Sequence, residues 1–130
     1  MDTRYHIYFY IFKNYLNTTS DIGYRRGDNM EWGDFPILKI GICRNDLDRI
    51  QENTKREVKD RFVDIWGKIT LYGKVVVDSK EIAYHYEQKL LEALGEKDFW
   101  LKEKPKGITE MRIWTTGRKK VVDFFIKEFS

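Results

Sequence analysis

Two apolar segments constrain the fold of this chain more than any other feature of its sequence. Residues 5–13 read YHIYFYIFK, with Tyr8 and Tyr10 on one face and apolar side chains alternating on the other. This period of two, in aromatic and β-branched residues, is typical of a strand. Residues 37–42, ILKIGI, predict a second strand, and the shortest connection places it antiparallel beside the first. We therefore expect the two segments to pair in one sheet.

The rest of the chain predicts helices and further short strands around this pair. Residues 69–77 (ITLYGKVVV) predict a third strand, and Asp78 with Glu81 fits a capping box that opens a helix, which Gly95 closes. Three weaker elements are a helix capped by Asn45 or Asp46, a strand at 109–114, and a terminal helix with apolar positions Val121, Val122, Phe125, Ile126 and Phe129. The pattern predicts an α+β fold, a small central antiparallel sheet of about three strands flanked by helices.

Length and composition indicate a single soluble domain. The 130 residues fit one domain over 1–130, with a turn-rich loop insertion at about 14–36 and a strand-helix extension at about 107–130. Hydrophobic residues make up 42% and charged residues 35%, which excludes a disordered chain. The net charge of +3 is compatible with a polyanionic partner without requiring one.

Cysteine usage and hydropathy indicate the compartment. Cys43 is the one cysteine, so an internal disulfide is excluded, and no Cys/His cluster has the spacing of zinc ligands. No apolar run approaches the length of a membrane span, and the N-terminal segment lacks a small-residue cleavage site. We expect a cytoplasmic protein with no membrane association.

The helix predicted between Asp78 and Gly95 carries a carboxylate in its apolar stripe. Ala83 lies four residues before Glu87, and Leu90 and Leu91 lie three and four residues after it. A buried ionised carboxylate is strongly unfavourable unless a cation, a metal or strong donors compensate it. An arginine partner, or a side chain bent out to solvent, would explain Glu87 as well as a metal would.

Four sequence elements occur in an order that marks a family resemblance. They are YFYIFKN at 8–14, KIG at 39–41, Arg49 after a short turn, and Glu87 on a later helix. In this order the chain resembles the GIY-YIG nuclease superfamily, and looks closest to the phage-type branch whose second signature reads KIG.

This resemblance implies a metal-dependent endonuclease that hydrolyses DNA phosphodiester bonds. Tyr10 would act as general base, Arg49 would contact the scissile phosphate, and Glu87 would hold a single Mg²⁺ or Mn²⁺ ion. An unperturbed phenol has a pKa of about 10, so a nearby cation must favour phenolate, and Lys39 on the neighbouring strand is the candidate. Gly41 would let the substrate approach the backbone. A solvent-exposed strand lysine is an equally good interpretation of Lys39.

The chain also departs from the family pattern. Tyr8 replaces the glycine of GIY, Lys39 replaces the tyrosine of YIG, and Asn53 stands near a position where many members carry a histidine. The alternative is therefore a catalytically inactive module, on the same scaffold, that binds nucleic acid or protein.

Basic residues outside this series are candidates for DNA contact. Two groups combine positive charge with positions outside the predicted core: Arg25 and Arg26 in the loop, and Arg118, Lys119 and Lys120 at the start of the terminal helix. An ordinary solvated surface explains both groups nearly as well. The expected partner is DNA, and the absence of a separate DNA-binding domain leaves a homodimer open as a source of specificity.

Overall fold

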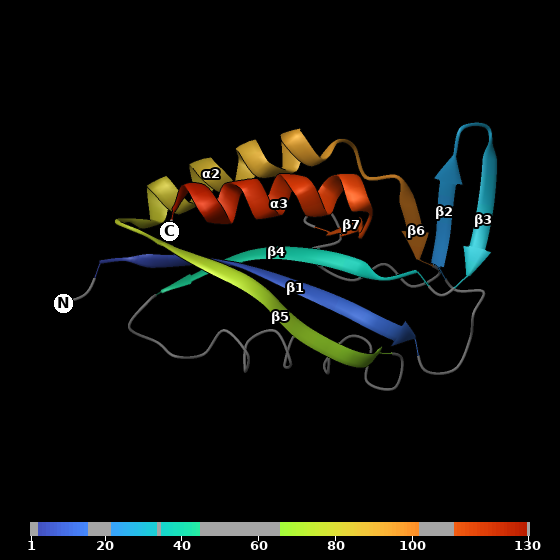
Figure 1. Cartoon of the computed structure of the whole chain (residues 1–130), viewed down its shortest axis with the longest axis horizontal. Helices are drawn as coiled ribbons and strands as arrows, with labels where there is room; N and C mark the ends of the chain where they lie inside the picture. Colours follow the sequence, from blue (N-terminus) through green and yellow to red (C-terminus); the bar gives the residue numbers. More distant parts are fainter. Residues whose placement is uncertain (1–2, 16–21, 34, 45–65, 102–110, 130) are drawn as a thin grey trace.

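The described part of the computed structural model contains two antiparallel sheets and two helices (Figure 1). The residues that it describes are 3–15, 22–33, 35–44, 66–101 and 111–129. The helix expected after Asn45, with Arg49 and Asn53, lies outside the described residues.

The larger sheet has four strands in the order β5-β1-β4-β7. Their bounds are β5 (Trp66–Val77), β1 (Tyr5–Tyr15), β4 (Ile37–Arg44) and β7 (Met111–Ile113). The expected antiparallel pairing of the two apolar segments is confirmed, because β1 and β4 pair from Tyr5 with Arg44 to Phe12 with Ile37. The expectation of about three strands is corrected, since β7 adds a fourth beside Ile37–Lys39.

Two helices cover one face of this sheet (Figure 1). Helix α2 (Lys80–Leu94) begins after Ser79, whose hydroxyl accepts a hydrogen bond from the backbone N–H of Ile82 at 3.2 Å. The cap is thus Ser79 and not Asp78, while the expected end at Gly95 is confirmed, with φ of 88°. Helix α3 (Thr116–Glu128) is capped in the same way by Thr115.

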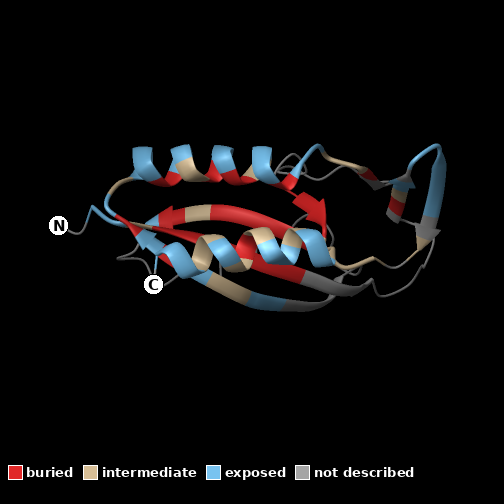
Figure 2. Ribbon diagram, turned by 45° about the horizontal axis from the view of Figure 1, so that its top comes forward, coloured by how far each residue is buried: buried red, intermediate tan, exposed pale blue. Residues whose placement is uncertain are grey.

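The core lies between the helices and the sheet, where Figure 2 shows the buried faces of β1, β4 and α2 meeting. Alternate residues of the strands supply one half of it: Ile7, Phe9, Ile11, Leu38, Ile40, Val75 and Val77. The helices supply the other half: Ala83, Leu90, Leu94 and Val122. Burial of these side chains is the main force that holds the two layers together.

The segment expected to be a loop insertion contains a hairpin. Strands β2 (Ile22–Arg26) and β3 (Asn29–Gly33) pair through a two-residue turn at Gly27–Asp28, where Gly27 has φ of 60°. Strand β6 (Phe99–Leu101) pairs with β2 and completes a second, three-stranded sheet beyond one end of the main sheet (Figure 1). Within the described part of the chain, no helix is long and apolar enough to cross a membrane.

Candidate functional site

Tyr10 and Lys39 are Cα partners on the paired strands β1 and β4. Their neighbours along each strand belong to the core beneath α2 and α3, so strand alternation places Tyr10 and Lys39 together on the opposite face of the sheet. Both are buried, with 1% of Tyr10 and 4% of Lys39 exposed. The alternative interpretation of Lys39 as a solvent-exposed strand lysine is therefore wrong.

Tyr8 and Gly41 form the next cross-strand pair on this face. A Cβ atom added to Gly41 would lie 2.2 Å from the Tyr8 hydroxyl oxygen, so the phenol ring occupies the space beside the glycine. The Tyr8 ring also contacts the Tyr10 ring edge to face, with centroids 5.5 Å apart. Gly41 thus makes room for Tyr8, and the hypothesis that it makes room for a substrate is corrected.

The pairing of β1 with β5 is irregular beside Tyr10. Phe9 pairs with Gly73 on β5 while Tyr10 pairs with Leu71, so Tyr72 is an extra residue that forms a β-bulge. Such bulges are over-represented beside active sites, where they redirect a side chain. The Tyr72 hydroxyl donates a hydrogen bond to Asp123 of α3, which ties this irregular point of the sheet to the helix layer.

Glu87 lies in the buried stripe of α2, as its spacing predicted. It shares this stripe with Ala83 and Leu90, and only 4% of the residue is exposed. Because the stripe packs against the core face of β4 and β1, Glu87 belongs to the helix-covered side of the sheet. Tyr10 and Lys39 belong to the other side.

The described members of the predicted series therefore do not share one face of the sheet. Among the described strands, β7 pairs with β4 only from Ile37 to Lys39, so the remainder of β4 towards Arg44 forms the edge of the sheet. The sheet lies between Glu87 and the pair of Tyr10 and Lys39, so the structure does not bring these predicted site residues together. Arg49 lies outside the described residues, so its contact with the scissile phosphate stays a prediction.

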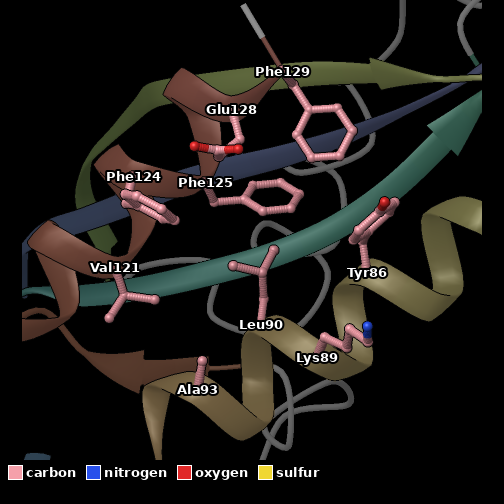
Figure 3. Close-up of a pocket in the computed structure, with 9 residues that line it drawn as sticks. All are labelled: Tyr86, Lys89, Leu90, Ala93, Val121, Phe124, Phe125, Glu128 and Phe129. Carbon is pink, nitrogen blue, oxygen red and sulfur yellow. The ribbon is translucent and has the colours of Figure 1, made fainter.

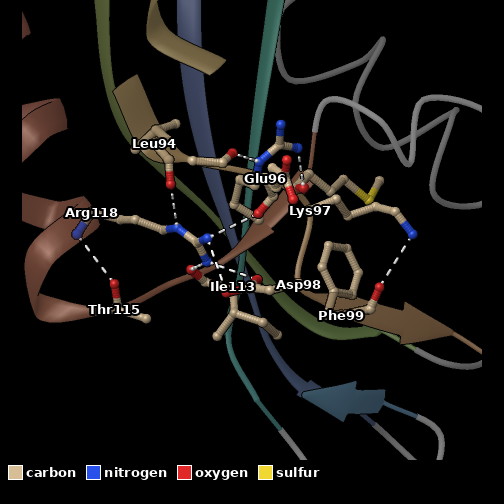
Figure 4. Close-up of polar contacts among 11 residues, drawn as sticks. Leu94, Glu96, Lys97, Asp98, Phe99, Ile113, Thr115 and Arg118 are labelled. Carbon is tan, nitrogen blue, oxygen red and sulfur yellow. Dashed lines mark hydrogen bonds and ion pairs between the residues drawn. The ribbon is translucent and has the colours of Figure 1, made fainter. Parts of the chain in front are cut away.

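Arg118 does not have the surroundings of a DNA contact (Figure 4). Its Nε donates to the carbonyl of Leu94, and its two terminal nitrogens donate to Asp98, Ile113 and Glu96 through four further hydrogen bonds. A guanidinium has five N–H donors, so protein oxygens account for all of them. Arg118 thus connects the end of α2 to the start of α3.

The other basic candidates differ from Arg118. Lys119, Lys120 and Arg25 are all exposed, and Lys119 pairs with Asp123 of the same helix at 2.9 Å. The side chain of Arg26 lies outside the described part of the structure. Lys119, Lys120 and Arg25 accordingly stay candidates for phosphate contact, and so does Arg26 as a prediction.

Arg112 on β7 is a buried charged residue that sequence reasoning missed. Its Nε donates to the carbonyl of Gly95 at 2.9 Å, and Nη1 donates to the carbonyl of Met111 at 2.8 Å. Burial lowers the pKa of Arg112, and the nearby Arg118 adds to this effect, while Asp98 opposes it. The signal that could have found it is an arginine between two apolar residues in a short strand, Met111 and Ile113.

The described residues offer few ligands for a metal ion. Among the described residues, no three His, Cys, Asp or Glu side chains lie close enough to share a metal ion. A hard divalent cation can be held by one carboxylate together with substrate oxygens, so Glu87 fits this role as a single ligand. Burial raises the pKa of the Cys43 thiol to about 11, which does not favour the thiolate needed of a ligand or nucleophile.

Comparison of the chain with protein-family models, curated proteins and solved structures finds no match.

Proposed function

We propose that this protein is a metal-dependent endonuclease of the GIY-YIG type that hydrolyses DNA phosphodiester bonds. One observation carries the proposal: the predicted ionisable residues Lys39 and Glu87 are both withdrawn from water, 4% exposed each. Lysine and glutamate are rarely buried to this extent, so two of them at positions selected by the family resemblance favour a functional role.

The chemistry requires a nucleophilic water, a contact that stabilises charge on phosphorus, and an electrophile for the phosphate oxygens. Tyr10 would accept the proton of the water, whose oxygen forms the new bond to phosphorus as the bond to the leaving oxygen breaks. Lys39, directly opposite Tyr10, would stabilise the negative charge of the phenolate. Arg49 would contact the scissile phosphate.

Glu87 would hold the divalent ion. A bound Mg²⁺ or Mn²⁺ would supply Lewis-acid stabilisation of the phosphate oxygens. Residues on α2 that share the stripe are apolar, so the carboxylate of Glu87 is the oxygen ligand that this face of the helix offers.

A specific observation supports the second candidate, an inactive module that binds nucleic acid or protein. Tyr10, Lys39 and Glu87 are nearly inaccessible to water, so a phosphodiester can reach them only when the residues that cover them move. A protein that had lost catalysis could retain such residues for packing alone. Glu87 also lies on the other side of the sheet from Tyr10 and Lys39. Catalysis therefore requires both an opening and a rearrangement that a binding module does not need.

Plasmid cleavage separates the two candidates. Purified protein is incubated with supercoiled plasmid and Mg²⁺ or Mn²⁺, and a parallel reaction contains EDTA. The endonuclease proposal predicts nicked and linear DNA only in the reactions with metal. Intact plasmid with both metals, from protein that is folded by circular dichroism, would favour the inactive module.

A further inference from the structure

A groove between α2 and α3 is the main feature that the proposed nuclease function does not use. It has a volume of about 480 Å³ and is lined largely by apolar and aromatic side chains of both helices (Figure 3). Leu90, Ala93 and Val121 contribute aliphatic surface, whereas Phe125 and Phe129 contribute aromatic rings. Its composition is that of a site for an apolar group.

Beside the groove, a large aromatic side chain faces water. Phe124 of α3 lines the groove and is 66% exposed, and Phe129 is 37% exposed. An exposed phenylalanine next to an apolar hollow gives this surface both a projection and a recess. Contiguous apolar surface of this kind marks interaction sites on soluble proteins.

The charged residues of the groove lie on opposite banks. Lys89 belongs to α2 and Glu128 belongs to α3, and both are exposed. The helices run antiparallel, because the rings of Tyr86 and Phe129 are in contact while the carbonyl of Leu94 accepts from Arg118 near the other end. Lys89 and Glu128 are therefore at similar levels along the groove.

This arrangement of charges is self-complementary. A two-fold axis parallel to the groove places α2 of one molecule against α3 of a second copy. Lys89 of each copy then faces Glu128 of the other, and Phe124 of each copy meets the apolar groove opposite. A second copy would use both the apolar groove and the charged residues on its two banks, whereas an uncharged peptide or small apolar ligand would use the groove alone.

We infer that the groove between α2 and α3 is the interface of a homodimer, held by reciprocal insertion of Phe124 and two pairs of Lys89 with Glu128. The inference does not depend on the proposed nuclease activity, since the groove shares no residue with the candidate site.

The oligomeric state of the full chain tests this interface. Sedimentation velocity over a range of protein concentrations should show a monomer–dimer equilibrium. Phe124→Glu should yield a monomer, while the matched control Tyr84→Glu, at an exposed aromatic residue of α2 outside the groove, should dimerise like the wild type. Circular dichroism establishes that each variant is folded.

Charge reversal gives the sharper test. Lys89→Glu and Glu128→Lys each replace two attractive contacts with two repulsive ones, so each should weaken dimerisation by about tenfold or more. When the two variants are mixed, both contacts of the heterodimer become attractive, and dimer should reappear. The double variant Lys89→Glu/Glu128→Lys should also dimerise.

Three results would overturn the inference. They are a wild-type chain that stays monomeric at the highest concentration, a Phe124→Glu variant that dimerises normally, and single reversals that do not recover on mixing. A monomer that binds a hydrophobic dye in the groove, with binding lost in Phe124→Glu, would assign the groove to an apolar ligand instead.

Discussion

Tyr10 and Lys39 lie directly opposite each other on β1 and β4, and both are buried on the face of the sheet that α2 and α3 do not cover. In a directly opposed antiparallel pair, Cβ atoms are about 5 Å apart, so an ammonium and a phenol can act on each other. In the proposed mechanism, this pairing makes Lys39 the cation that stabilises the phenolate of the general base, Tyr10.

Replacing Tyr10 by phenylalanine removes the proposed proton acceptor and keeps the ring. Under the endonuclease proposal, the cleavage rate of Tyr10→Phe should fall by about 10² or more, the usual scale for a lost general base. The free energy of unfolding should change by about 1 kcal/mol or less. Plasmid cleavage and urea unfolding measure the two quantities, and Tyr8→Phe on the same face is the control. A wild-type cleavage rate for Tyr10→Phe would show that another group activates the water.

Gly41 and Tyr8 supply a test of packing on this face. Because an added Cβ would meet the Tyr8 ring, Gly41→Ala should lower the free energy of unfolding by roughly 1–3 kcal/mol. In the double variant Tyr8→Ala/Gly41→Ala the clash is absent, so the destabilisation should be smaller than the sum of the single effects. Gly117→Ala, where an added Cβ has room, is the control. Additive effects would contradict this packing.

The same pair explains a departure from the family pattern. In the proposed alignment, Tyr8 stands where GIY has its glycine, and it pairs across the strands with the glycine of KIG. The second glycine leaves the space that the Tyr8 ring fills. The space beside Gly41 therefore accommodates the Tyr8 ring in the observed pairing of β1 with β4.

Arg118 is expected to stabilise the junction of α2 and α3. Arg118→Met removes five hydrogen bonds and leaves the partly buried Asp98 without its ion pair. The free energy of unfolding should therefore fall by roughly 2–4 kcal/mol. Lys120→Met, at an exposed position of the same helix, should change stability by about 0.5 kcal/mol or less. Urea unfolding measures both. Unchanged stability with weaker DNA binding would show instead that Arg118 contacts phosphate.

Asp123 gives a prediction for acid conditions. The hydrogen bond from Tyr72, followed by that from Lys119, lowers the pKa of Asp123. A carboxyl whose pKa is lower in the folded state contributes stability above its unfolded pKa and loses it as pH falls through the folded value. The stability difference between wild type and Tyr72→Phe should thus be constant near neutral pH and shrink below about pH 4. Thermal unfolding of both proteins, from pH 7 into the acid range, measures this stability difference. A difference that stays constant with pH would exclude the linkage.

Much of the fold could be predicted because hydrophobic spacing determines it. The alternation in β1 and the apolar run of β4 predicted their pairing, and the stripe around Glu87 predicted its burial. The hairpin of β2 and β3 was missed, because its strands are short and rich in polar residues. The third strand of this smaller sheet, β6, comes from a distant part of the sequence.

The candidate site was predictable only in part. Strand register follows from local pattern, so Tyr10 and Lys39 could be placed together. The position of Glu87 relative to them depends on which face α2 covers, and this is decided by tertiary packing. The role of Arg118 depends on carbonyl groups from the end of α2 and from Ile113, which no local sequence pattern specifies.

Cleavage by Glu87→Gln tests the proposed function most directly. The amide keeps the shape of the side chain but is a poor ligand for a hard divalent ion. We predict that Glu87→Gln binds DNA like the wild type and cleaves no plasmid with Mg²⁺ or Mn²⁺, whereas Glu92→Gln, at an exposed carboxylate of the same helix, cleaves normally. Wild-type cleavage by Glu87→Gln would contradict the account, because the activity would then not depend on the carboxylate proposed to hold the metal.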